Sequence, residues 1–240
     1  MPETFQFKCH LLRIGSITFL TGLAIFIISS VFHASREDPT NHLRVFAEYA
    51  NSPPWIAAHI GQFVGEIIMF AGGFVALFRL LVQSESMTVS VLAWIGFAAA
   101  IIAASTLSIL QAVDGIALKL AVDSWVVAPA EEKMAAFRVA EGIRWTEVGT
   151  NSMYRILQGT VAIVFGVAIT CSPIVGRWIG AIGIFAGAAT IAAGVEVAYV
   201  GFASVNVVSY QLVSKITYYV WIGILGAFIW RKAISKTVTV

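Results

Sequence analysis

Three polar residues on one predicted apolar helix are the first groups in this chain that could do chemistry. The stretch Pro54–Leu81 carries His59, Gln62 and Glu66. Their spacing of i, i+3 and i+7 places an imidazole, an amide and a carboxylate on one helix face. Imidazoles and carboxylates can both bind metal ions and carry protons. Because a charged group facing lipid costs on the order of 3 kcal/mol, we expect this face to point towards other helices or water.

Other predicted spans carry polar groups towards the same side of the membrane. These groups are Gln111 and Asp114 on the third span, Glu147, Asn151 and Arg155 on the fourth, and Glu196 and Tyr199 on the fifth. An interhelical hydrogen bond typically contributes about 0.6 kcal/mol, so stability alone is a weak reason to collect so many. We therefore predict that they form, with the three residues above, a pocket for a small molecule or ion, open to the non-cytoplasmic side. The alternative is that they only link the helices by hydrogen bonds and ion pairs.

Two histidines at similar predicted depth support a second hypothesis. His33 follows the first span and His59 begins the second. With a carboxylate nearby, they could ligate zinc, copper or iron, or act as the two axial ligands of a haem. The chain would then be a metal- or haem-dependent membrane oxidoreductase, or a subunit of one. The sequence contains no H-E-x-x-H or C-x-x-C-H motif, no G-x-S-x-G elbow and no Walker loop, and it predicts no specific catalytic residue.

Composition places the chain among multi-span membrane proteins. Hydrophobic residues make up 59% and charged residues 12% of the sequence, and the mean hydropathy is +0.87. The net charge is only +2 and the basic residues are scattered, which excludes a nucleic-acid-binding protein. The six predicted spans are residues 11–32, 55–81, 89–118, 145–170, 174–199 and 210–230. We expect an all-α integral membrane six-helix bundle that forms a single transmembrane domain over residues 1–240.

The first loop and the flanking charges predict how the bundle sits in the membrane. Leu43, Phe46 and Tyr49 recur at helical spacing, which predicts a short amphipathic helix resting on the bilayer surface. An even number of spans puts both termini on one side. Lys and Arg are slightly more frequent on that side, so we expect the termini to be cytoplasmic, in the plasma (inner) membrane. Cys9 and Cys171 lie on the same side and are expected to be reduced.

Small residues predict close helix packing and allow a third hypothesis. The pairs Gly61/Gly65, Gly176/Gly180 and Gly183/Gly187 follow the small-xxx-small pattern that lets membrane helices approach closely. If these faces bound other chains, the protein would be a homo-oligomer or a structural subunit of a larger membrane complex.

Several short motifs resemble a known group of proteins. They are DP at 38–39, W-x-x-x-H at 55–59, ALFRLL at 76–81, QAVDG at 111–115 and the polar stripe over 144–155. Together with the Gly-rich fifth span, they are similar to an uncharacterised family of bacterial multi-span membrane proteins. The resemblance implies a similar layout of spans and brings no activity, substrate or ligand for any residue.

Overall fold

The described part of the chain is built entirely from helices. The computed structural model describes residues 3–33, 40–202 and 205–235, with the helical backbone alone at 3–5, 205–210 and 235. Six helical stretches in it are long and apolar enough to cross a membrane, which confirms the predicted all-α multi-pass bundle. The first is α1 (Glu3–Val31), and the last three are α7 (Lys133–Cys171), α8 (Arg177–Val200) and α9 (Val205–Ser235).

The second and third stretches each contain a π-helical segment. The second runs through α3 (Trp55–Ile68), η1 (Met69–Phe74) and α4 (Val75–Leu81). The third runs through α5 (Met87–Gln111), η2 (Ala112–Leu118) and α6 (Lys119–Val127). Such wide turns are rare, and they often occur at functional sites in helices.

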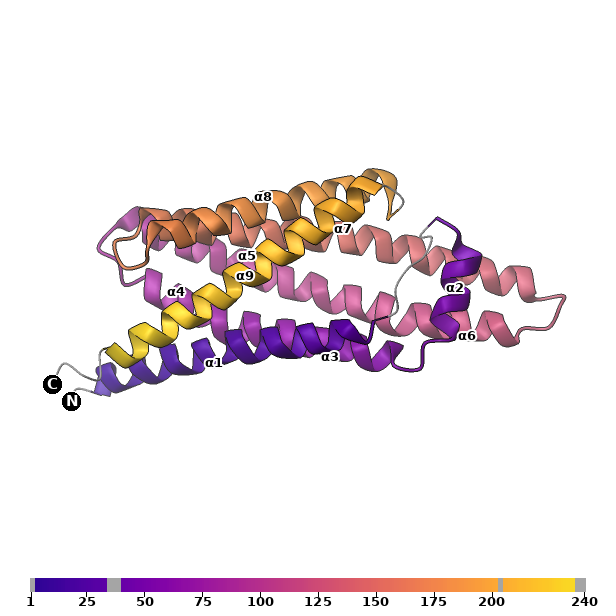
Figure 1. Ribbon diagram of the computed structural model, residues 1–240, viewed down its shortest axis with the longest axis horizontal. Coiled ribbons are helices and arrows are strands. Elements are labelled where there is room, and N and C mark those ends of the chain that lie inside the picture. The colour runs from indigo at the N-terminus through magenta and orange to yellow at the C-terminus, as the bar shows by residue number, and fades with distance from the viewer. Residues whose placement is uncertain (1–2, 34–39, 203–204, 236–240) are drawn as a thin grey trace.

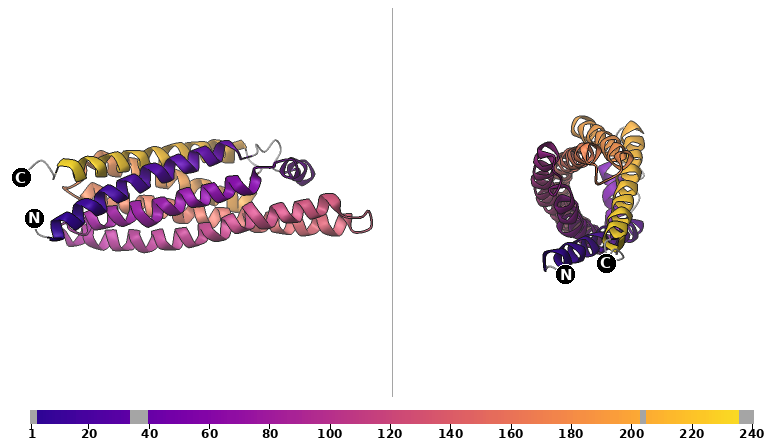
Figure 2. Two further views of the ribbon diagram at one scale, coloured as in Figure 1. Left: turned by 90° about the horizontal axis from the view of Figure 1, so that it is seen from below. Right: turned by 90° about the vertical axis from the view of Figure 1, so that its left-hand side faces the viewer.

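Two helices extend well beyond the others at one end of the molecule. Both chain termini lie at the opposite end, and α6 and the start of α7 project as a hairpin (Figures 1 and 2). The stretch Met87–Val127 has 41 residues and α7 has 39, so each is roughly 60 Å long, against roughly 30 Å of hydrocarbon. Both helices therefore continue beyond the predicted span limits at residues 118 and 145. Charged residues such as Lys119 and Asp123 lower the hydropathy there without breaking the helix, which ends just before Pro129.

The predicted amphipathic helix in the first loop is present as α2 (His42–Ala50). It lies across the α6–α7 hairpin (Figure 1), and its buried face is formed by Val45, Phe46 and Tyr49. Leu43, which was expected on the apolar face, is instead 59% exposed. Val45 is buried in its place, because it lies four residues before Tyr49 and so shares a helix face with it.

Glycines bring neighbouring helices into close contact, most of all α7 and α8. A Cβ atom added at Gly159 would lie 2.5 Å from the Gly187 carbonyl oxygen, and one added at Gly187 would lie 2.5 Å from that of Gly159. On the second span, Gly65 meets Gly22 of α1 in the same way. These glycines thus pack against helices of the same chain, so they are not needed to explain contact with another chain.

A tightly packed apolar core fills the part of the bundle nearer the termini. The Phe74 ring stacks on Phe165 with centroids 5.4 Å apart and meets the edge of Phe19 at 5.2 Å. All three rings are fully buried. The side chains discussed next lie on the far side of this core, towards the α6–α7 hairpin.

Candidate functional site

The polar residues expected to share one chamber form separate groups. His59 and Asp114 meet, and His33 lies beside them. Glu66 contacts a different set of side chains deeper in the bundle. We refer to His33, His59 and Asp114 as the His–Asp centre, and to Glu66, Tyr154, Gln158 and Tyr219 as the Glu66 cluster.

The helix that carries His59 also fixes the orientation of its ring. α3 begins at Trp55, directly after Pro53 and Pro54. Proline is tolerated at a helix start because the first backbone N–H groups have no partner within the helix. One turn later, the His59 Nδ1 atom lies 2.8 Å from the Trp55 carbonyl oxygen. A carbonyl can only accept, so Nδ1 carries the hydrogen. The lone pair of the neutral ring is therefore on Nε2.

Asp114 reaches His59 from the π-helical segment η2. Its Oδ2 atom is 3.2 Å from His59 Nε2, and the two side chains are only 9% and 2% exposed. The Trp55 indole donates a hydrogen bond of 3.2 Å to the Asp114 carbonyl oxygen. The next residue is Gly115, where an added Cβ would lie 2.4 Å from the His59 Cβ. The glycine is what lets α3 and η2 approach closely enough for the two side chains to meet.

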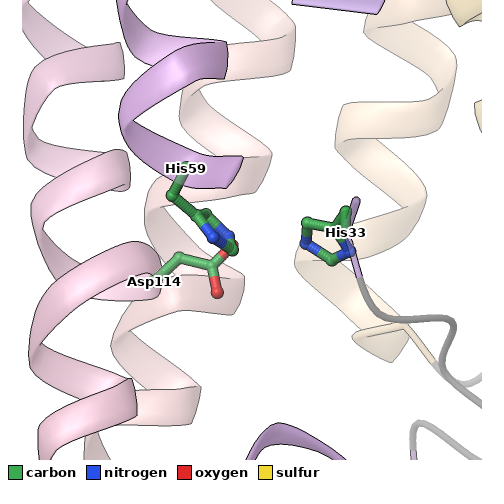
Figure 3. Close-up of side chains that lie close together, drawn as sticks. All are labelled: His33, His59 and Asp114. Atoms are coloured by element: carbon green, nitrogen blue, oxygen red, sulfur yellow. The ribbon is translucent and has the colours of Figure 1, made fainter. Parts of the chain in front are cut away.

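His33 completes a group of three potential metal ligands. It follows the end of α1, and its ring centroid is 4.8 Å from that of His59 and 4.9 Å from that of Trp55. The potential ligand atoms of the His–Asp centre all lie within 4.8 Å of one another. Figure 3 shows the three side chains converging from separate segments of the chain.

The facing atoms of His59 and Asp114 favour a proton or a cation between them. A carboxylate oxygen and an imidazole lone pair, both electron-rich, point at each other. Either a second proton on His59 or a cation would make the contact attractive. Ligands about 2.1 Å from a shared metal ion lie between about 3.0 and 3.4 Å apart, which brackets the observed 3.2 Å. The arrangement fits both an imidazolium–carboxylate pair and a metal site.

A haem between the two histidines fits the geometry less well. Two axial nitrogens on opposite faces of a haem are roughly 4 Å apart, and the ring centroids farther still. Here the centroids are only 4.8 Å apart, and the Nε2 side of His59 faces Asp114. A single ion needs far less room, so the geometry favours a small cation.

The Glu66 cluster is a complete hydrogen-bond network. Glu66 is 3% exposed. Tyr154 donates to its Oε2 atom, and Tyr219 donates to its Oε1 atom at 2.6 Å. The Gln158 amide in turn donates to the Tyr154 oxygen at 3.0 Å. Helices α3, α7 and α9 are thus joined around one carboxylate in which each oxygen has a donor.

The remaining predicted residues occupy other places. Gln62 donates to the Ser30 hydroxyl on α1 at 3.2 Å, and Arg155 donates to Asn151 on its own helix at 2.7 Å. Glu147 pairs with Arg144 inside α7, and both are buried. The Gln111 side-chain oxygen is buried, with no hydrogen-bond partner among the described residues. Glu196 is partly buried on α8. Tyr199 is 86% exposed, so it does not line the interior as predicted.

A cavity of about 620 Å³ lies where α2, α7 and the end of α8 meet. Its lining residues are Thr40, Asn41, His42, Leu43, Phe137, Glu141, Arg144, Trp145, Val148, Val200, Gly201 and Phe202. None of the residues predicted to line a pocket is among them. This cavity lies nearer the end of the bundle than the predicted pocket residues, and the side chains of the Glu66 cluster contact one another.

Several residues that shape the two groups escaped prediction. Trp55 supplies both a carbonyl acceptor and an indole donor, and Gly115 provides the close approach. The W-x-x-x-H spacing does place the Trp55 carbonyl four residues before His59, where a helical side chain can reach it. Nothing in the sequence predicts hydrogen bonds from Tyr154 and Tyr219, because a tyrosine in an apolar span can equally well serve only in packing.

Comparison of the chain with protein-family models, with curated proteins and with solved structures finds no match.

Proposed function

We propose that this multi-pass membrane protein binds a divalent transition-metal ion through His33, His59 and Asp114. The observation that carries the proposal is the 3.2 Å contact of His59 Nε2 with Asp114 Oδ2, made while Nδ1 is held by the Trp55 carbonyl. Histidines that ligate metals commonly donate their other ring N–H to a backbone carbonyl, which fixes the tautomer and aims the lone pair at the ion.

The donor set indicates which metals to expect. Two imidazoles and one carboxylate suit zinc, copper or iron, and three protein ligands leave a coordination position for water or another small ligand. The longest separation between ligand atoms, 4.8 Å, is close to twice a metal–ligand bond, roughly 4.2 Å. A small inward shift of His33 would bring all three to one ion.

The position of the centre suits an ion that enters from water. Asp114 lies 27 residues after the start of α5 at Met87, or roughly 40 Å along the helix, which exceeds the roughly 30 Å of hydrocarbon. An ion there need not cross the apolar core. We place the centre on the non-cytoplasmic side of a bacterial inner membrane, because Lys and Arg are slightly more frequent at the end that carries the termini.

Metal content tests the proposal directly. Protein purified in mild detergent and dialysed against Zn²⁺ should hold about one ion per chain by elemental analysis, and Co²⁺ should give visible absorption bands. His59→Ala should lose both signals. His10→Ala is the matched control, because His10 is exposed at the far end of the bundle, and it should keep both. Wild-type protein that holds neither ion would contradict the proposal. The contact of His59 with Asp114 would then be an ion pair in which His59 is protonated.

The 620 Å³ cavity favours a second candidate function, binding of a small amphiphilic molecule. Its volume is typical of ligand sites, and its lining combines Phe137, Trp145 and Phe202 with the His42–Glu141 pair, whose atoms are 3.0 Å apart. A thermal-shift screen of neutral, anionic and cationic amphiphiles tests it. Stabilisation by one class that Trp145→Ala abolishes supports this function, and the absence of any shift contradicts it.

A further inference from the structure

A second cavity lies at the opposite end of the bundle, far from the His–Asp centre. It has a volume of about 440 Å³ and opens between the start of α8 and the end of α9. Its lining residues are Gly176, Trp178, Ile179, Phe228, Arg231 and Lys232. This is the end at which both termini lie (Figure 1).

Among the described residues, the lining of this cavity carries only positive charge. Arg231 and Lys232 contribute a guanidinium and an ammonium group, and the other lining residues have no ionisable side chain. The start of α8 adds the partial positive charge of a helix N-terminus, through Gly176 and Trp178. A site of this kind attracts an anion.

The surrounding surface has the same sign. Cationic side chains described at this end are Lys8, Arg13, Arg79, Arg177, Arg231 and Lys232, against the single carboxylate of Glu85. The hairpin end is mixed, because Lys119 pairs with Asp123, and Arg138 with Glu141. Excess positive charge is therefore a property of one end of the molecule.

The cavity also has an apolar wall, which favours a lipid over a free anion as its occupant. Ile179 is 1% exposed and Phe228 is partly buried, while Trp178 is 59% exposed at the helix end. The Lys232 ammonium lies 5.7 Å from the Phe228 ring centroid. Since the ends of spanning helices lie at the membrane surface, an occupant with an anionic head and acyl chains matches both kinds of wall.

We propose that this cavity binds the head group of an acidic phospholipid, with the phosphate near Arg231 and Lys232 and the acyl chains running down the outside of α8 and α9. Basic pockets between membrane helices are known to recognise such head groups. Each cation near a membrane surface contributes about fivefold to this affinity, so the two together contribute roughly 30-fold.

Lipid binding by the purified, delipidated protein tests the proposal. In native mass spectrometry, phosphatidylglycerol should be retained in preference to phosphatidylcholine, and the double variant Arg231→Gln/Lys232→Gln should reduce this preference by roughly 30-fold. The matched control is Lys133→Gln/Arg138→Gln, which removes the same charge from the exposed hairpin end and should leave the preference unchanged. Both pairs lie near helix ends outside the apolar core, so the variants are expected to fold.

Three results would overturn the proposal. The first is equal retention of the two lipids by the wild-type protein. The second is an equal loss of preference in the control double variant, which would indicate attraction by overall charge. The third is displacement of phosphatidylglycerol by millimolar inorganic phosphate, which would indicate a site for a free anion.

Discussion

The His–Asp centre and the Glu66 cluster are two buried carboxylate sites that differ in the atoms facing the carboxylate. His59 and Glu66 share one face of the second span, seven residues apart. Around Glu66, each carboxylate oxygen accepts a phenol hydrogen bond. At Asp114, the oxygen faces an imidazole nitrogen whose ring already uses its other N–H. One carboxylate has a donor on each oxygen, and the other faces a nitrogen that carries the lone pair of the neutral ring.

The comparison shows that burial of an acid does not by itself identify a functional site. Both carboxylates are nearly inaccessible, and burial in the protein makes a charge costly at either one. What differs is the balance of donors and acceptors around each. A network in which every acceptor has a donor can be purely structural, whereas two acceptor atoms that face each other favour a proton or a cation between them.

Neutralising each carboxylate in turn should give the largest contrast. Asp114→Asn keeps the shape of the side chain but replaces a ligand oxygen, so Zn²⁺ affinity should fall by at least about 100-fold, since even outer-shell partners commonly change affinity by 10–100-fold. Glu66→Gln should change it less than about twofold. Competition with a chromophoric chelator, on protein shown to be folded by circular dichroism, measures both. Equal losses in the two variants would end the distinction between the sites.

Gly115→Ala should disrupt the His–Asp centre through packing. The added methyl group would overlap the His59 Cβ, which belongs to a fixed helix, so we expect about 1–3 kcal/mol of destabilisation and weaker metal binding. Gly142→Ala is the matched control on α7, where an added Cβ meets nothing within 4 Å. It should stabilise the protein by about 0.5–1 kcal/mol, as alanine usually does in a helix. Unfolding by SDS in mixed micelles measures both, and an unaffected Gly115→Ala protein would contradict the close approach.

Removing one phenol should affect stability and leave metal binding unchanged. Tyr219→Phe deletes the donor to Glu66 Oε1 and should cost about 1 kcal/mol, because a buried carboxylate oxygen loses its partner. Tyr199→Phe, at an exposed tyrosine, should lie within about 0.5 kcal/mol of wild type. The same SDS titration measures both. A Tyr219→Phe protein with reduced Zn²⁺ affinity would show that the Glu66 cluster supports the metal ligands.

Much of the architecture followed from the sequence, because the cost of exposing polar backbone in lipid leaves helices as the main solution for long apolar runs. Residues 55–81 form one continuous helical stretch, as predicted. α6 and the start of α7 extend beyond the predicted spans, since hydropathy detects where lipid contact ends and not where a helix ends. Lys119 and Asp123 lie outside the apolar segment but are part of the helix.

The site was only partly predictable. Proximity of His33 and His59 was a hypothesis that their predicted depth allowed, but the sequence left open which carboxylate would join them. The structure brings Asp114 to the two histidines. Depth alone could not separate Glu66 from His59, because residues seven apart share a helix face but face different neighbours. Only the packed structure shows that Gly115 allows His59 to reach Asp114, and that Tyr154 and Tyr219 donate hydrogen bonds to Glu66.

Gln62 offers the finest test, because it lies between the two sites on the same helix face. Its amide donates to Ser30 Oγ, and that hydroxyl donates to the Phe26 carbonyl at 2.8 Å. Ser30 therefore keeps one partner in Gln62→Leu, and the loss should be no more than about 0.6 kcal/mol, the average for interhelical hydrogen bonds in membranes. Zn²⁺ affinity should stay within about twofold of wild type. If Gln62→Leu instead weakened Zn²⁺ binding tenfold, or if its effect on unfolding were not additive with that of Tyr219→Phe, the polar face would act as one network and the two sites could no longer be treated as independent.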